Sequence, residues 1–173
     1  MAEATPALEI RNLHKRYGEL EVLKGISLTA RDGDVISILG SSGSGKSTLL
    51  RCINLLENPH EGQILVAGEE LKLKKAKSGE LVAADGKQIN RMRSELGFVF
   101  QNFNLWPHMT ILDNIIEAPR RMLGQSKAEA IEVAEALLAK VGIADKRHAY
   151  PSELSGGQQQ RAAIARTLAM QPK

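Results

Sequence analysis

The sequence contains little cysteine, few aromatic residues and no long apolar run. The single cysteine, Cys52, cannot form a disulfide within the chain, and a small buried residue is its simplest interpretation. No apolar stretch approaches the roughly 18 residues of a membrane-spanning helix. The first residues lack a basic segment followed by an apolar one, so no signal peptide is predicted. These absences favour a protein of the reducing cytosol that meets a membrane only through partners.

Strong charge and metal-ligand clusters are also absent from the sequence. The net charge is only +3 over 173 residues, which a solvated basic face explains, and we expect no nucleic-acid partner. Four histidines lie far apart without the spacing of metal ligands, so they predict no metal site of their own. They are His14, His60, His108 and His148.

The strongest motif is a glycine-rich loop that ends in lysine and serine. Residues 40–47 match G-x-x-x-x-G-K-[ST] between an apolar run over 34–39, predicted as a strand, and a helix predicted over 47–57. Backbone N–H groups of such a loop and of the helix start form an anion cradle. We expect Lys46 at the β- and γ-phosphates, Ser47 on Mg²⁺ and Thr48 near the α-phosphate. The predicted nucleotide-binding residues of this loop are Gly40, Ser41, Ser42, Gly43, Ser44, Gly45, Lys46, Ser47 and Thr48.

A second glycine pair precedes a predicted helix near the other end of the sequence. The segment is Leu154, Ser155, Gly156, Gly157 and Gln158, and the helix that follows is predicted to run toward Met170. Alone, Ser-Gly-Gly indicates a turn or linker, but before a helix it presents N–H groups to an anion. Two such cradles in one chain exceed what a single nucleotide site needs.

The remaining segments change in character along the chain. Strands are predicted over 7–10, 27–29, 63–66 and 96–100, and the polar, lysine-rich stretch 69–93 indicates an exposed hairpin or solvated loop. From residue 102 the pattern is helical, with one helix opening at Thr110 and kinked or ended by Pro119. Another helix is predicted from the capping box at Ser126 to a stop at Gly142. We therefore expect a nucleotide-binding core over 1–101 and a helical part over 102–173.

Together these motifs resemble the nucleotide-binding subunit of ATP-binding cassette (ABC) transporters, and the resemblance covers nearly the whole chain. It implies an α/β P-loop NTPase fold with a small antiparallel β part and a helical subdomain. In that family two such domains face each other head to tail, and each ATP lies between the P-loop of one and the signature motif of the other. By this resemblance Leu154 to Gln158 is the signature motif. Ser155 and Gly157 would then contact the γ-phosphate that the partner holds.

Three further positions match the family. The resemblance implies that Tyr17 stacks on adenine beside Val22, and that Gln101 contacts Mg²⁺ or the attacking water. The plainer interpretations are a half-buried strand tyrosine and a surface glutamine. The segment 102–109, with Phe103 and Trp106, is either a core plug or the groove that receives a helix of the transmembrane subunit, and both interpretations stay open.

Several segments of the sequence also resemble a particular subfamily. Residues 50–57, 103–110 and 117–119 look like those of polar amino-acid importers, and 79–85 resembles the branch that serves basic amino acids. The resemblance implies transmembrane permease subunits as partners and, indirectly, a periplasmic or surface solute-binding protein. It also implies a peripheral location on the cytoplasmic face of the membrane. An ATPase for a different solute remains an alternative, because no residue of such a subunit touches the solute.

The sequence departs from the family after the signature helix. The family continues there with an apolar strand that ends in Asp-Glu, and then with a switch histidine, whereas residues 154–173 contain no Asp, Glu or His. Gln101 is then the one catalytic candidate, and we expect little or no hydrolysis by residues 1–173. We also expect a truncated core with unpaired apolar sheet edges.

The same motifs have two alternative interpretations to the importer ATPase. A non-catalytic nucleotide-binding fragment remains open. A DNA-repair or chromosome-organising ATPase of the same family is disfavoured, because 52 residues without heptads separate Gln101 from Leu154.

Overall fold

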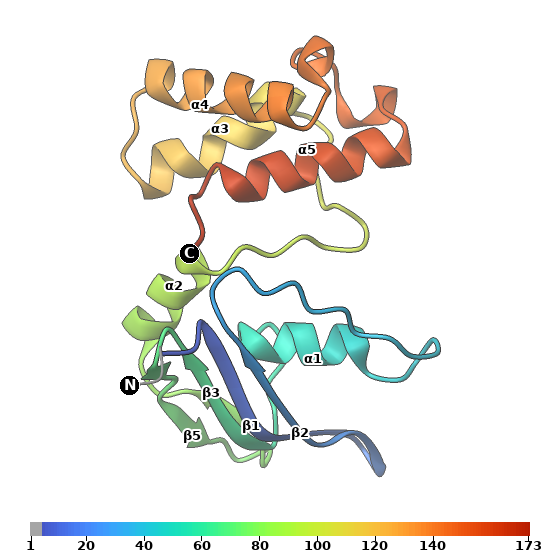
Figure 1. The fold of residues 1–173 in the computed structure, drawn as a ribbon, viewed down its shortest axis with the longest axis vertical. Coiled ribbons are helices and arrows are strands. Elements are labelled where there is room, and N and C mark those ends of the chain that lie inside the picture. The colour runs from blue at the N-terminus through green and yellow to red at the C-terminus, as the bar shows by residue number, and fades with distance from the viewer. Residues whose placement is uncertain (1–4) are drawn as a thin grey trace. The chain divides into compact units, whose positions relative to one another are not determined.

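The computed structural model describes residues 5–173, and its backbone divides into two compact units. The first unit ends at Arg93 and the second runs over Ser94–Lys173. Figure 1 traces both along the chain, with antiparallel strands and the helix α1 in the first and three longer helices in the second. Among residues 5–173, no helix is both long and apolar enough to cross a bilayer.

A four-stranded antiparallel sheet forms the centre of the first unit. Its strands are β1 (Leu8–Tyr17), β2 (Leu20–Ala30), β3 (Glu61–Val66) and β4 (Glu69–Glu70), in the order β2-β1-β3-β4. The strands predicted over 7–10, 27–29 and 63–66 are therefore confirmed, and the first two are much longer than predicted. Apolar side chains from three strands are buried to form the core of this sheet: Ile10, Leu13, Leu23 and Ile64.

Helix α1 (Lys46–Ile53) follows the glycine-rich loop and packs beside β2 (Figure 1). It buries Leu49 and Cys52. The helix ends at Ile53 with Asn54 as its C-cap, earlier than the predicted Glu57, because Leu55 adopts a left-handed backbone with φ 52°. Arg93 donates to the carbonyls of Asn54 and Leu55 at 2.9 and 2.8 Å, which satisfies acceptors left over at the helix end.

Two strand predictions are wrong. Residues 34–39 and 96–100 form no strand, and Val35 and Leu39 expose 95% and 90% of their surface. Both segments are apolar and bounded by turn residues, which is the local signature of a buried strand. A strand also needs a neighbour to satisfy its N–H and C=O groups. Among residues 5–173 neither segment has such a partner.

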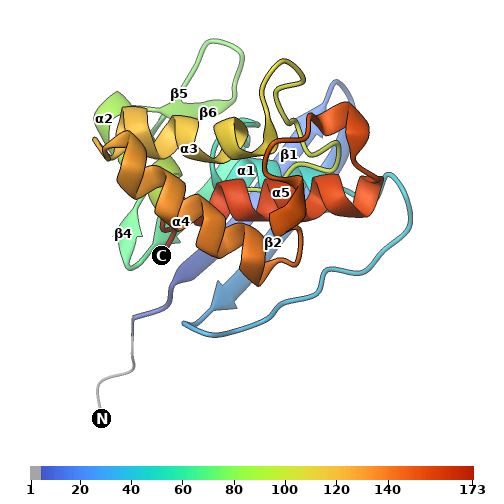
Figure 2. The same ribbon diagram turned by 90° about the horizontal axis from the view of Figure 1, so that it is seen from above.

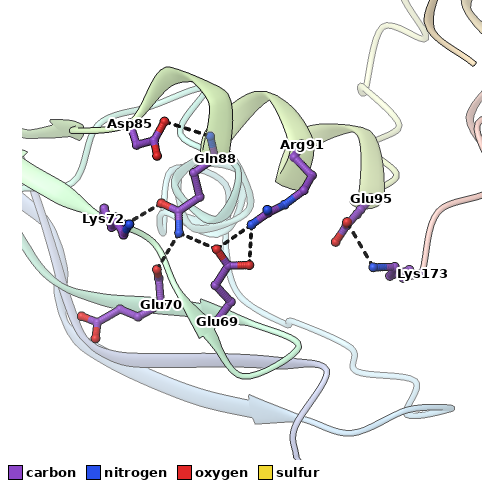
Figure 3. A network of polar contacts seen from close by, with 8 residues as sticks. All are labelled: Glu69, Glu70, Lys72, Asp85, Gln88, Arg91, Glu95 and Lys173. Carbon is purple, nitrogen blue, oxygen red and sulfur yellow. Dashed lines mark hydrogen bonds and ion pairs between the residues drawn. The ribbon is translucent and has the colours of Figure 1, made fainter.

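The lysine-rich excursion is more ordered than a solvated loop. Strands β5 (Leu73–Lys75) and β6 (Leu81–Ala83) pair as the predicted hairpin, and helix α2 (Gly86–Glu95), which the sequence analysis missed, follows. Figure 3 shows how Gln88, only 5% exposed, joins the parts. Its side chain accepts from the Lys72 N–H and donates to Glu69 and to the Glu70 carbonyl, so α2 is bonded to β4.

The second unit is built on α3 (Ile111–Met122), α4 (Lys127–Lys140) and α5 (Gly156–Leu168), with short 3₁₀ turns at Ala144–Lys146 and Pro151–Glu153. Figure 2 shows these helices lying alongside one another. The predicted capping box at Ser126 and the stop at Gly142 are present. Pro119 lies inside α3, which continues to Met122, so the prediction that the proline could end this helix is wrong. The apolar core includes Ile111, Ile115, Leu138 and Ala162.

Candidate nucleotide-binding site

The turn before α1 depends on Gly45. Its φ is 91°, a left-handed value that side-chain-bearing residues rarely adopt, and a Cβ added here would lie 2.8 Å from Val22 Cγ1. Strand β2 therefore packs directly against the backbone of the loop. Only glycine allows both the turn and this close approach.

The loop and the helix start offer donors to an anion. Helix α1 has no side-chain cap at its N-terminus, so its first N–H groups keep their positive potential. Lys46 bends back along the loop, and its Nζ donates to the carbonyls of Gly40 and Ser41 at 2.8 and 2.7 Å. These bonds hold the ammonium against the backbone of the loop. The serines of the loop, Ser41, Ser42, Ser44 and Ser47, are all exposed.

Tyr17 and Val22 lie near the turn that joins β1 to β2. Tyr17 ends β1 opposite Leu20 and exposes 47% of its surface. Val22, two residues further along β2, is the residue that contacts Gly45. The first unit thus places an aliphatic side chain against the anion cradle and exposes an aromatic ring at the end of the neighbouring strand. An aromatic ring and an anion cradle are groups that can contact the base and the phosphates of a nucleotide.

Cys52 has no chemical role in this site. The thiol is fully buried in α1, and this burial raises its pKa to about 12, so it stays a neutral thiol at physiological pH. Over the part of the chain that the structure describes, no group of three or more His, Cys, Asp or Glu side chains could hold a metal ion.

The signature segment opens α5 with a complete capping box. Ser155 Oγ accepts from the Gln158 N–H at 3.4 Å, and Gln158 Oε1 accepts from the Ser155 N–H at 2.9 Å. Gly156 and Gly157 are exposed and have no left-handed backbone. A Cβ added to either would meet nothing within 4 Å. Leu154 is buried in the core of the second unit and anchors the segment.

Gln101 and the loop after it lie in the second unit. Gln101 is an exposed turn residue. Leu105 packs against the helical core, while Trp106 is 38% exposed, so the loop carries both inward and outward side chains. Phe103 and Asn104 have left-handed backbones, with φ of 60° and 47°. Their carbonyls accept from Arg166 of α5 at 2.9 and 2.7 Å.

A buried asparagine holds the same loop through hydrogen bonds to its backbone. Asn114 of α3 is fully buried, and its side-chain oxygen accepts from the Trp106 N–H at 2.7 Å. Its amide nitrogen donates to the carbonyls of Trp106, Met109 and Thr110. Sequence reasoning gave no role to Asn114 or Arg166. A polar residue at an inward position of an apolar helix face was the available signal for Asn114.

Lys15 is the other residue that sequence reasoning missed. It lies in β1 and is only 1% exposed, with its ammonium 4.9 Å from the centre of the Tyr17 ring. Its burial could have been inferred from its position in the strand, because it lies two residues after the buried Leu13 and therefore on the same face of the sheet.

These features define an ATP-binding cassette, and the comparison with known proteins agrees. The sequence profile of the ABC transporter family matches residues 23–173, and the chain belongs to this family. It is 65% identical over 166 residues to the arginine/ornithine transport ATP-binding protein AotP of Pseudomonas aeruginosa, covering 96% of this chain and 65% of that protein. It is 58% identical over 172 residues to the nopaline permease ATP-binding protein P of Agrobacterium fabrum, covering 99% and 67%.

Solved structures give the same fold. The dimeric structure of a bacterial ABC transporter cassette superposes with a TM-score of 0.80 at 35% identity, covering 95% of this chain and 70% of that one. A second structure of that cassette, described as a post-hydrolysis state bound to ADP and Pi, gives a TM-score of 0.79. The predicted α/β fold of the ABC type is therefore confirmed. The chain spans 65% of the length of AotP.

Proposed function

We propose that this chain is the nucleotide-binding part of an ATPase that energises import of polar, basic amino acids across the cytoplasmic membrane. The observation that carries the proposal is the P-loop. Lys46 is held against the loop backbone, the start of α1 is uncapped, and the same unit exposes a tyrosine. The amino-acid class rests on the relatives, which are named for transport of arginine and ornithine or of nopaline.

Each part of ATP has proposed contacts in the first unit. Tyr17 stacks on adenine beside Val22, and the backbone from Gly40 to Gly45 surrounds the phosphates. Lys46 binds the β- and γ-phosphates, and Thr48 adds a hydroxyl near the α-phosphate. The exposed Ser47 hydroxyl suits Mg²⁺, a hard cation that takes oxygen ligands and keeps several waters. The second proposed Mg²⁺ contact, Gln101, belongs to the second unit and is taken from the family resemblance.

The second cradle belongs, in this proposal, to the ATP of another copy. Leu154 to Gln158 would close over the γ-phosphate held by the partner, with the Ser155 hydroxyl donating while it accepts from Gln158. A hydroxyl can do both at once. The open space beside Gly156 and Gly157 supports this, because neither glycine is required by contacts within the described chain.

The remaining partners follow from the same proposal. Gln101 and the loop 102–109 would meet transmembrane permease subunits at the cytoplasmic face of the membrane, and a solute-binding protein would deliver the solute to that complex. The exposed Trp106 supports a contact role for this loop. We further propose that a polypeptide of residues 1–173 binds ATP but hydrolyses it slowly, since residues 154–173 provide no carboxylate for Mg²⁺ or water.

Calorimetry of ATP binding with Mg²⁺ tests the proposal. We expect saturable binding by residues 1–173 that Lys46→Ala abolishes and that Lys77→Ala, a change at an exposed hairpin lysine, leaves intact. Phosphate release from the same samples separates binding from turnover, and fast turnover by residues 1–173 would refute the slow-hydrolysis proposal.

Arginine uptake by vesicles that carry the permease and the full-length subunit tests the solute class. Uptake that does not depend on Lys46 would exclude an energising role.

A further inference from the structure

The buried ammonium of Lys15 is fully satisfied by three oxygen acceptors. Its Nζ lies 2.9 Å from Glu57 Oε1 and 2.8 Å from Glu80 Oε1, and it donates to the Asn58 carbonyl at 2.8 Å. An ammonium has three N–H groups, so no donor of Lys15 remains for another partner. The charge of Lys15 therefore holds the surrounding groups in place and does not contact a ligand.

The three acceptors come from parts of the first unit that are distant in sequence. Glu57 and Asn58 follow α1, the helix that begins at the P-loop, and Glu80 lies in the hairpin between β5 and β6. Lys15 itself belongs to β1, two residues before Tyr17. One ammonium thus joins the P-loop helix, the strand that ends in the aromatic ring, and the lysine-rich excursion.

The same ammonium lies against one face of the Tyr17 ring, 4.9 Å from its centre. A cation within about 6 Å of an aromatic ring is attracted to its face and favours one ring orientation. Tyr17 is nevertheless 47% exposed, so ring surface remains accessible on the side away from Lys15. The lysine backs the ring while the exposed part stays free for a base.

The charges of the cluster are stable at physiological pH. Burial alone would lower the pKa of Lys15, but its contacts with Glu80 and Glu57 outweigh this effect, and the pKa is raised. The contact with Lys15 lowers the pKa of Glu80. Lys15 therefore remains a cation, and Glu80 an anion, in the conditions under which a nucleotide binds.

We propose that Lys15, held by Glu57 and Glu80, is a positioning residue that orients the Tyr17 ring for the adenine base. Through Glu80, the excursion 69–93 contributes to nucleotide affinity although it does not contact the nucleotide. The inference rests on the proposed function, because it concerns the base-stacking role of Tyr17.

Calorimetry with two ligands tests the inference on residues 1–173. We expect Lys15→Met to weaken ATP binding about tenfold and to leave the affinity for inorganic tripolyphosphate within about twofold, since only ATP carries a base. Glu80→Gln should weaken ATP binding about threefold with the same selectivity. Lys74→Met and Glu61→Gln change exposed residues of neighbouring strands and should alter neither affinity. A Lys15→Met variant that binds ATP like the parent, or that loses both ligands equally, would overturn the inference.

Proton NMR of the Tyr17 ring gives a second readout. The chain has two tyrosines, Tyr17 and Tyr150, so Tyr17→Phe assigns the signals. ATP should shift the Tyr17 ring protons in the parent and shift them less in Glu80→Gln, which decides the matter if Lys15→Met does not fold. An unchanged shift in Glu80→Gln would contradict the inference. If neither Lys46→Ala nor Tyr17→Ala affects ATP binding by the parent chain, the proposed function itself fails.

Discussion

The two glycine-containing helix starts of this protein differ in what their glycines do. At α1, Gly45 has a left-handed backbone, contacts Val22 and leaves the helix without a side-chain cap. At α5, Ser155 and Gln158 cap the helix reciprocally, and Gly156 and Gly157 have ordinary backbones beside open space. Folding of the first cradle thus requires glycine at position 45. The second folds without that need, and the open space beside its glycines supports the proposed approach of another molecule.

The largest effect expected is on the first cradle, from Lys46→Ala. Removing the ammonium deletes charge-assisted hydrogen bonds to phosphate, each worth about 1.5–3 kcal/mol. We expect ATP affinity to fall at least about 100-fold in calorimetry. The unfolding midpoint should change little, because Lys46 bonds within the exposed loop, to the carbonyls of Gly40 and Ser41 and the hydroxyl of Ser44. A loss below about threefold would show that the loop is not the phosphate site.

A matched pair of glycine substitutions tests the comparison directly. Gly45→Ala should lower the free energy of unfolding by about 2 kcal/mol, since it combines backbone strain with a clash against Val22. Gly157→Ala should leave it unchanged or raise it by up to about 1 kcal/mol, because alanine favours a helix over glycine. Urea denaturation measures both. Equal destabilisation by the two variants would remove the distinction between the cradles.

Gly157→Ala should still impair the proposed composite site. We expect ATP-dependent self-association, followed by analytical ultracentrifugation, to be weakened although the monomer remains stable. Self-association of this variant equal to that of the parent would show that the space beside Gly157 has no role in the contact.

Substitutions of Ser155 separate its cap from its proposed contact with phosphate. Ser155→Ala removes the cap and should cost about 1 kcal/mol of unfolding free energy. Ser155→Asp supplies another good cap and should preserve stability, while its negative charge repels a phosphate. We expect Ser155→Asp to keep the melting temperature and to lose ATP-dependent self-association. A variant that kept both would show that Ser155 only caps the helix.

The smallest effect concerns the pH dependence that Glu80 contributes to the first unit. Its pKa in the folded chain is below the ordinary 4.5 because of Lys15. The contact therefore stabilises the fold above about pH 4.5 and is lost as the pH falls through the lowered folded pKa. Glu80→Gln should cost up to about 1 kcal/mol at pH 7, since Glu80 is partly exposed, and less at pH 3. Urea unfolding at both pH values measures this, and an equal cost at both would contradict it.

The motifs were predictable because their signals are local. The glycine-rich loop with Gly45 and Lys46 is recognised within eight residues, and the capping box at Ser126 is recognised within four. The strands that depend on distant pairing were less predictable. Residues 34–39 have the composition of a buried strand, but composition does not supply the neighbour that a strand requires.

Lys15 was missed for a related reason. A lysine in a short sequence window is assigned to solvent, because burying its charge is unfavourable without partners. One of its partners, Glu80, lies 65 residues away. The same holds for Arg166, whose acceptors in the loop 102–109 are 62 and 63 residues distant. Only the folded chain shows that these cations have hydrogen-bond acceptors.

The fully bonded amide of Asn114 has a consequence for how this protein can evolve. The path of the loop from Trp106 to Thr110 is held from inside, by one side chain of α3 acting on backbone groups. The exposed His108 takes no part in those bonds, whereas the Trp106 ring lies 5.5 Å from the Arg166 guanidinium that donates to the same loop. We expect His108 to be exchangeable while the loop keeps its path, so new recognition can arise here by point mutation at little cost to folding.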